Sequence, residues 1–134
     1  MNIELMKRYM REHKLDAVMA MDPHATAYLR GFFHGSHLRT LRFDDHPCFP
    51  VFMKSGEAFV VDFMSWAPPE EVRPDWCSRY YQGRGAGMNG LEINLEVLAE
   101  ALKEHGLASG RIGLDLDEAP YNAVRHLQEL VPQA

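Results

Sequence analysis

Two short apolar runs in the middle of the chain place the strongest constraint on its fold. The runs CFPVFMK at 48–54 and EAFVVDF at 57–63 are separated by Ser55 and Gly56. A tight connection at glycine between two apolar runs is typical of a β-hairpin. Because proline has no backbone N–H to donate, Pro50 predicts that the first strand lies at a sheet edge or carries a bulge there.

Helices and strands are expected to alternate along the rest of the chain. Ile3, Met6 and Met10 recur at helical spacing and predict an amphipathic helix. Leucines recur at the same spacing after residue 90, and a glycine follows as a C-cap. The expected order is a helix at 2–13, a strand at 16–21, a short helix at 24–30, the hairpin, a strand at 77–82, a helix at 91–105, a strand at 111–115 and a helix striped by Tyr121, Val124, Leu127 and Val131.

This order favours an α/β fold with a mixed β-sheet and helices on its faces. The run at 16–21 is apolar without alternation, as in a strand that is covered on both faces. The chain has 134 residues, of which 46% are hydrophobic and 25% charged, and this is the range of one globular domain. We therefore predict a single domain over 1–134.

Charge and hydropathy argue against several classes of partner. Fourteen basic and nineteen acidic side chains give a net charge of −5, which is unsuited to a phosphate backbone, so no nucleic acid partner is expected. Apolar runs such as 58–63 are far shorter than the roughly 20 residues that cross a bilayer, so no membrane span is expected. The N-terminal segment has no apolar signal core, which predicts a cytoplasmic protein with Cys48 and Cys77 as free thiols.

A glycine-rich segment offers one candidate ligand site. Gly85, Gly87 and Gly90 form a GxGxxG pattern between a possible strand and a helix, and Asp115 ends the next strand. In a dinucleotide-binding protein such glycines let the backbone approach a pyrophosphate, and an acid binds the ribose. The preceding strand is polar, however, where that fold has a buried aliphatic strand. A small nucleotide-binding module and a plain connecting loop both stay open.

No other constellation amounts to an active site. His34 and His37 lie close together and His46 is near Cys48, but structural zinc sites need paired short spacings, so no metal site is expected. The acids at 115–118 precede a predicted helix, where capping explains them. Asp62 could join them as a paired-carboxylate site or could cap its strand end. We assign no catalytic residue to the chain.

Three stretches, taken in order, resemble one known family. The opening LMKRYMREHKLDAVMAMDPHATAYLRGF is similar to a pattern of helix, Leu-Asp-Ala, apolar strand and Asp-Pro-x-x-x-x-Tyr-Leu-x-Gly-Phe in the N-terminal domains of creatinases and prolidases. FPVFMKSGEAFVVDF looks like the hairpin of that family. The closing stretch ALKEHGLASGRIGLDLDEAPYNAVRHLQELVPQA is similar to its leucine-rich helix, its Gly-x-Ile-Gly-x-Asp strand and its last helix.

The resemblance implies a ribonuclease-H-like domain, a mixed sheet with helices on both faces. In the family this domain precedes a pita-bread catalytic domain, where aspartates, a histidine and glutamates bind a pair of divalent metals in the peptidases, whereas creatinase has no metal. That catalytic domain is expected to be absent from these 134 residues. The chain then resembles the noncatalytic, cofactor-free domain of an Xaa-Pro dipeptidase or aminopeptidase, or of a creatinase-like hydrolase, with a dipeptide or another small molecule as substrate.

The resemblance also implies a role for the segment at 34–46. In the family the N-terminal domain helps to form homodimers, and in creatinase-like members a loop reaches the active site of the neighbouring subunit with an aromatic residue and an arginine. Counted without gaps, the matching positions are His37 and Arg39, so a histidine replaces the aromatic residue. The loop is longer here, which leaves Arg42 and Phe43 as alternatives. We expect a mobile, substrate-gating loop, because guanidinium suits carboxylate recognition.

Overall fold

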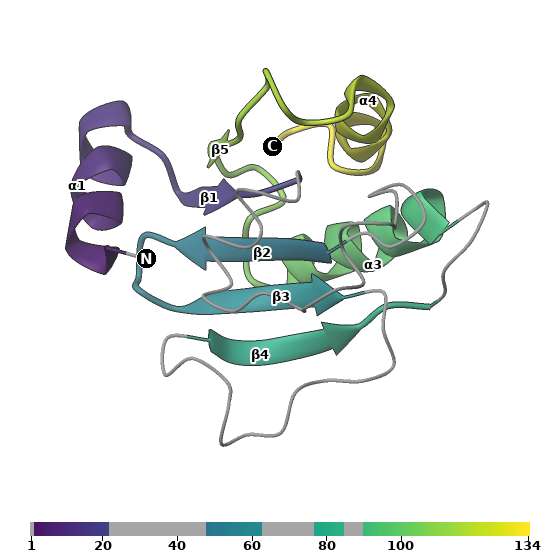
Figure 1. Cartoon of the computed structure of the whole chain (residues 1–134), viewed down its shortest axis with the longest axis horizontal. Helices are drawn as coiled ribbons and strands as arrows, with labels where there is room; N and C mark the ends of the chain where they lie inside the picture. Colours follow the sequence, from purple (N-terminus) through teal and green to yellow (C-terminus); the bar gives the residue numbers. More distant parts are fainter. Residues whose placement is uncertain (1, 22–47, 63–76, 85–89) are drawn as a thin grey trace, which may run out of the picture.

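The computed structural model describes residues 2–21, 48–62, 77–84 and 90–134 (Figure 1). Its elements are α1 (Ile3–His13), β1 (Ala17–Met19), β2 (Cys48–Met53), β3 (Ala58–Asp62), β4 (Cys77–Gln82), α3 (Gly90–Glu104), β5 (Ile112–Gly113) and α4 (Tyr121–Leu130). Every predicted element within these ranges is present, although β1 and β5 are shorter than expected. The helix predicted at 24–30 and the loop predicted at 34–46 lie outside the described residues.

The strands form one five-stranded mixed sheet in the order β4-β3-β2-β1-β5. β2 pairs antiparallel with both β1 and β3, whereas β5 and β4 each pair parallel with their neighbour. The hairpin between β2 and β3 closes as predicted, with the Met53 amide donating to the Glu57 carbonyl over 2.8 Å. Gly56 has a φ of +96° in this turn, a conformation that glycine adopts without strain.

The predictions drawn from Pro50 are wrong. β2 lies between β1 and β3, and Pro50 pairs with Val60 in regular register, while the irregularity of the sheet falls at Ala58, opposite β4. The Pro50 carbonyl accepts a hydrogen bond from the Ala20 amide over 3.2 Å. In an antiparallel pair the N–H and C=O of one residue point to the same neighbour. The N–H that Pro50 lacks would therefore face the chain just beyond the last residue of β1. Its absence removes little of the hydrogen bonding between β1 and β2.

Helices cover both faces of the sheet, as predicted. On one face Met10 of α1 packs in a cluster with Phe52 and Ala58. On the other face the leucines of α3 and the apolar residues of α4 pack with residues such as Phe59. β2 and β3 are buried along their whole length as a result. Among the described helices, none combines the length and the hydropathy needed to span a bilayer.

Candidate functional site

The proposed substrate contacts His37, Arg39, Arg42 and Phe43 lie outside the described residues. The structure does place the two ends of the described chain that flank them. β1 leads to Met21 and β2 begins at Cys48, and both of these residues are buried. The Ala20 amide and the Pro50 carbonyl are hydrogen-bonded across these neighbouring strands. Met21, after β1, and Cys48, at the start of β2, therefore lie at the same end of the sheet, and both are buried there.

The structure separates the acids that the sequence offered as a paired site. Asp62 ends β3 and is buried, whereas Asp115 follows β5 at the surface. β2 and β1 lie between these strands, and strands are spaced about 4.8 Å apart, so the two carboxylates lie three strand spacings apart. Asp62 and Asp115 therefore form no general acid and base pair.

The acids at 115–118 do not cap the last helix, contrary to our prediction. Pro120 stands at the N-cap of α4, no side chain caps the helix there, and its first turn holds no acidic residue. Asp115 instead accepts a hydrogen bond from the Asp117 amide over 3.1 Å. The backbone carbonyl of Asp115 accepts from Ala119 over 3.0 Å, so the acids form a turn of their own at 115–119.

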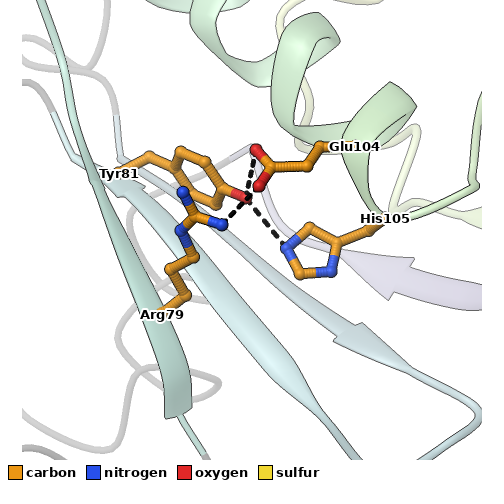
Figure 2. Close-up of polar contacts among 4 residues, drawn as sticks. All are labelled: Arg79, Tyr81, Glu104 and His105. Carbon is orange, nitrogen blue, oxygen red and sulfur yellow. Dashed lines mark hydrogen bonds and ion pairs between the residues drawn. The ribbon is translucent and has the colours of Figure 1, made fainter.

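A cluster of polar side chains that sequence reasoning missed joins β4 to the end of α3 (Figure 2). Arg79 and Tyr81 alternate on β4 and so share a face, while Glu104 ends the helix and His105 follows it. The Tyr81 hydroxyl donates to Glu104 Oε2 over 2.9 Å and lies 3.0 Å from His105 Nε2. Arg79 forms an ion pair with Glu104. The His105 ring stacks on Phe59 with their centroids 4.5 Å apart.

The charges and hydrogen bonds of this cluster hold β4 against the end of α3. Burial raises the pKa of Tyr81, and its hydrogen bond to Glu104 raises it further, so the phenol stays protonated. The same hydrogen bond, followed by the Arg79 contacts, lowers the pKa of Glu104. Because the only hydroxyl proton of Tyr81 goes to Glu104, His105 Nε2 must donate. Each group is satisfied by another, so the cluster ties the edge strand to α3. The signal in the sequence was Arg79 alternating with Tyr81 on a polar strand.

Asn94 organises the described ends of the glycine-rich segment. Its side chain is fully buried, its Nδ2 donates to the Gly90 carbonyl over 2.6 Å, and its Oδ1 accepts from the Arg84 amide over 3.2 Å. Gly90 is the first residue of α3, whereas Gly85 and Gly87 lie outside the described residues. β4 lies at the edge of the sheet, where a dinucleotide fold has a central strand. This placement favours the connecting loop over the nucleotide site.

The described residues offer no ligand set for a metal. No group of three or more histidine, cysteine, aspartate or glutamate side chains within these ranges could hold an ion. His34, His37 and His46 lie outside the described residues. Cys48 and Cys77 form no disulfide in the structure.

The sheet and its covering helices define a class, an α/β domain built on a mixed five-stranded sheet with helices on both faces. The family model of the creatinase/prolidase N-terminal domain matches residues 3–134, and the chain belongs to that family. A comparison with curated protein sequences gives no significant match.

Solved structures share the fold at low sequence identity. An Xaa-Pro dipeptidase from Bacillus anthracis superposes with a TM-score of 0.68 and 15% identity, covering 96% of this chain and 30% of that one. A proline dipeptidase from Streptococcus pneumoniae superposes with a TM-score of 0.64 and 16% identity, covering 99% of this chain and 87% of that one. The N-terminal domain of an Xaa-Pro dipeptidase from Lactobacillus brevis superposes with a TM-score of 0.61 and 13% identity, covering 97% of this chain and 87% of that one. The chain thus spans less than a third of the Bacillus anthracis protein.

Proposed function

We propose that this chain is the noncatalytic N-terminal domain of an Xaa-Pro dipeptidase or aminopeptidase, or of a creatinase-like hydrolase. The observation that carries the proposal is the family match over 3–134. The likeness to 30% of a dipeptidase chain supports a second, catalytic domain as its partner. No metal-binding group is found among the described residues, and the proposal assigns any divalent metals to that catalytic domain. The substrate is a dipeptide or a similarly small molecule.

The second part of the proposal concerns the segment at 34–46 in a homodimer. We propose that it reaches the active site of the neighbouring subunit and that Arg39 binds a substrate carboxylate there, with His37 beside it. Arg42 and Phe43 take these roles if the longer loop shifts the register. The support for this part is the family match, which includes the segment at 34–46. A planar guanidinium fork matches a carboxylate with two hydrogen bonds.

The test is kinetic and uses the protein that joins this domain to its catalytic domain. Arg39→Ala is expected to lower kcat/KM by at least about tenfold, the loss of one charge-assisted contact, with little change in melting temperature. Arg39→Lys keeps the positive charge but loses the planar guanidinium group. Its kcat/KM should therefore fall between those of the parent protein and Arg39→Ala. Arg125→Ala is the matched control, since that arginine pairs with Glu129 on the surface of α4. If Arg39→Ala and Arg42→Ala both keep the parental kinetics, the gating role is wrong.

A further inference from the structure

A surface hollow of about 650 Å³ lies between α1 and the chain around β5. Tyr9 and His13 of α1 line one side, and the stretch at 113–117 lines the other. Apolar side chains such as Leu15 and Val18 line its base. We call this site the α1–β5 hollow. A volume of this size with a mainly apolar lining is typical of a site for a small molecule.

An arginine and an aspartate line the hollow on either side of a glycine. Arg111 and Asp115 each stand two residues from Gly113, and all three residues line the hollow. Gly113 has no side chain, and Leu15 Cδ1 lies 2.7 Å from the position that a Cβ would take there. Leu15 therefore packs directly over the backbone of β5. An apolar floor thus lies between a basic and an acidic side chain.

The walls of the hollow offer apolar area that is open to solvent. The rings of Tyr9 and His13 have their centroids 4.2 Å apart, and Tyr9 is 48% exposed. Leu116 also lines the hollow and is 69% exposed. Single exposed apolar residues are ordinary, but two on the walls of one hollow give a ligand apolar surface to bury.

The charges at the hollow have no ion pair of their own among the described residues. This holds for Arg111, Asp115 and Asp117. Four other described arginines each pair with a glutamate, namely Arg8, Arg79, Arg84 and Arg125. The Asp115 carboxylate accepts from the Asp117 amide, and a carboxylate can accept further hydrogen bonds. Asp16 lies near Arg111, but its carboxylate already binds Lys54 and the Arg111 amide.

We propose that the α1–β5 hollow binds a short zwitterionic peptide with apolar side chains. The peptide carboxylate faces the Arg111 guanidinium, and the peptide ammonium group faces Asp115. Its side chains lie against Tyr9 and Leu116. The site is separate from the segment at 34–46 and needs no catalytic domain, so the proposal goes beyond the function proposed above and does not rest on it.

The signs of the two charges are the reason to choose a zwitterion. A guanidinium binds a carboxylate with two parallel hydrogen bonds, and a carboxylate accepts from an ammonium group. A ligand with charges of one sign only would be repelled by Arg111 or by Asp115. A zwitterion is attracted by both.

The spacing of the two charges is the reason to choose a peptide. Arg111 and Asp115 are four residues apart, so their Cα atoms are separated by at most about 14 Å. In a free amino acid both charged groups are attached to one carbon atom. A dipeptide separates them by about 7 Å, the length of two extended residues, so side chains that lean toward it can contact both ends.

An NMR titration of the purified chain with the dipeptide Phe-Leu tests the proposal. We expect saturable shifts at 9–13 and 111–117, with a dissociation constant at or below about 1 mM. Two capped forms each remove one charge of the ligand. N-acetyl-Phe-Leu has no ammonium group, and the C-terminal amide of Phe-Leu has no carboxylate. Each capped form should bind at least about threefold more weakly than Phe-Leu.

Two variants assign each charge of the ligand to its partner. Arg111→Met should weaken Phe-Leu and its N-acetyl form at least about threefold but leave the amide unchanged, because the amide has no carboxylate to bind. Asp115→Asn should weaken Phe-Leu and the amide but leave the N-acetyl form unchanged. The asparagine oxygen can still accept from the Asp117 amide. Arg125→Met on α4 is the control for a lost arginine and should bind like the wild type.

A matched pair of tyrosine variants tests the apolar wall. Tyr9→Ser should weaken every one of these ligands, because it removes apolar area that the ligand buries. Tyr121→Ser removes an exposed tyrosine from α4, outside the hollow, and should leave binding unchanged. Circular dichroism checks that every variant folds.

The absence of saturable shifts up to about 10 mM Phe-Leu would overturn the proposal, as would shifts that lie outside the hollow. Capped forms that bind the wild type as tightly as Phe-Leu would also overturn it, and this comparison depends on no variant. Free phenylalanine that binds as tightly as Phe-Leu would show that the site takes a single amino acid and not a peptide.

Discussion

Asp16 is the residue at which three strands meet. Its carbonyl accepts from the Lys54 amide over 2.9 Å, and its own amide donates to Arg111 over 2.8 Å. Its side chain forms an ion pair with Lys54 and accepts from the Arg111 amide over 2.9 Å. The Lys54 hydrogen bond and then the Arg111 amide lower the pKa of Asp16. One short acid thereby links β1 to β2 and β5.

Asp16→Ala is expected to lower the free energy of unfolding by about 1–2 kcal/mol at pH 7, because the Arg111 amide and Lys54 lose their acceptor. Since folding lowers the pKa of Asp16, its contribution is complete above the unfolded value of about 3.9 and is lost as pH falls through the folded value. The difference between wild type and variant in urea unfolding should therefore shrink below about pH 4. Lys54→Met, which spares the Arg111 contact, should cost less. A difference independent of pH would contradict this role of the carboxylate.

Tyr81→Phe isolates the hydrogen bond at the centre of the Figure 2 cluster. This bond is the largest cause of the lowered pKa of Glu104, so in the variant the Glu104 pKa should rise toward its ordinary value in an NMR titration. Loss of the hydroxyl should also cost about 1 kcal/mol of stability, a typical net value for one hydrogen bond. Tyr9→Phe on α1 is the control and should leave the Glu104 titration unchanged. An unchanged titration in Tyr81→Phe would contradict this role of the Tyr81 hydrogen bond.

Helices α1 and α3 end in the same backbone motif, but a different residue type occupies its left-handed position. Lys14 follows α1 with a φ of +55°, and the next amide, of Leu15, donates to Met10 over 2.8 Å. Gly106 follows the end of α3 with a φ of +73°, and the next amide, of Leu107, donates to Leu102 over 2.8 Å. Both are Schellman motifs, which favour glycine at the left-handed position. α1 therefore carries a strain that α3 avoids.

Opposite substitutions at these two positions should have opposite effects. Lys14→Gly is expected to raise the free energy of unfolding by about 0.5–1 kcal/mol, and Gly106→Ala to lower it by a similar amount. No atom lies within 4 Å of a Cβ built on Gly106, so the cost there is conformational. Lys14→Ala is the matched control for the lost lysine side chain and should be nearly neutral. Thermal and urea unfolding measure all three, and a stabilising Gly106→Ala would refute the argument.

At the scale of the whole molecule, the proposed function predicts that the purified chain does not cleave Xaa-Pro dipeptides. Within the described ranges Asp62 and Asp115 lie on separate strands, and no group of three or more side chains could hold a metal, whereas hydrolysis needs an assembled set of catalytic groups. Product release measured with manganese or zinc present should equal that of a chain-free blank. Metal-dependent cleavage that follows the chain through successive purification steps would refute the noncatalytic role.

Local patterns in the sequence were sufficient for the helices and the hairpin. Periodic apolar residues such as Ile3, Met6 and Met10 report one buried face whatever the rest of the chain does. The alternation of elements and the family resemblance both predicted a mixed sheet, and the observed strand order and the family match confirm it. The candidate contacts at 37–43 came from that resemblance alone, and they stay a prediction.

What only the tertiary structure decided were relations between distant parts of the chain. Pro50 is compatible with an interior strand because β1 ends beside it, and no pattern near Pro50 contains the length of β1. Asp62 and Asp115 are kept apart by the strand order, whereas Arg79 and Glu104 are brought together by the packing of α3 on the sheet. Hydropathy periods record which side of an element is buried. They do not record which element covers it, because that depends on contacts between residues far apart in sequence.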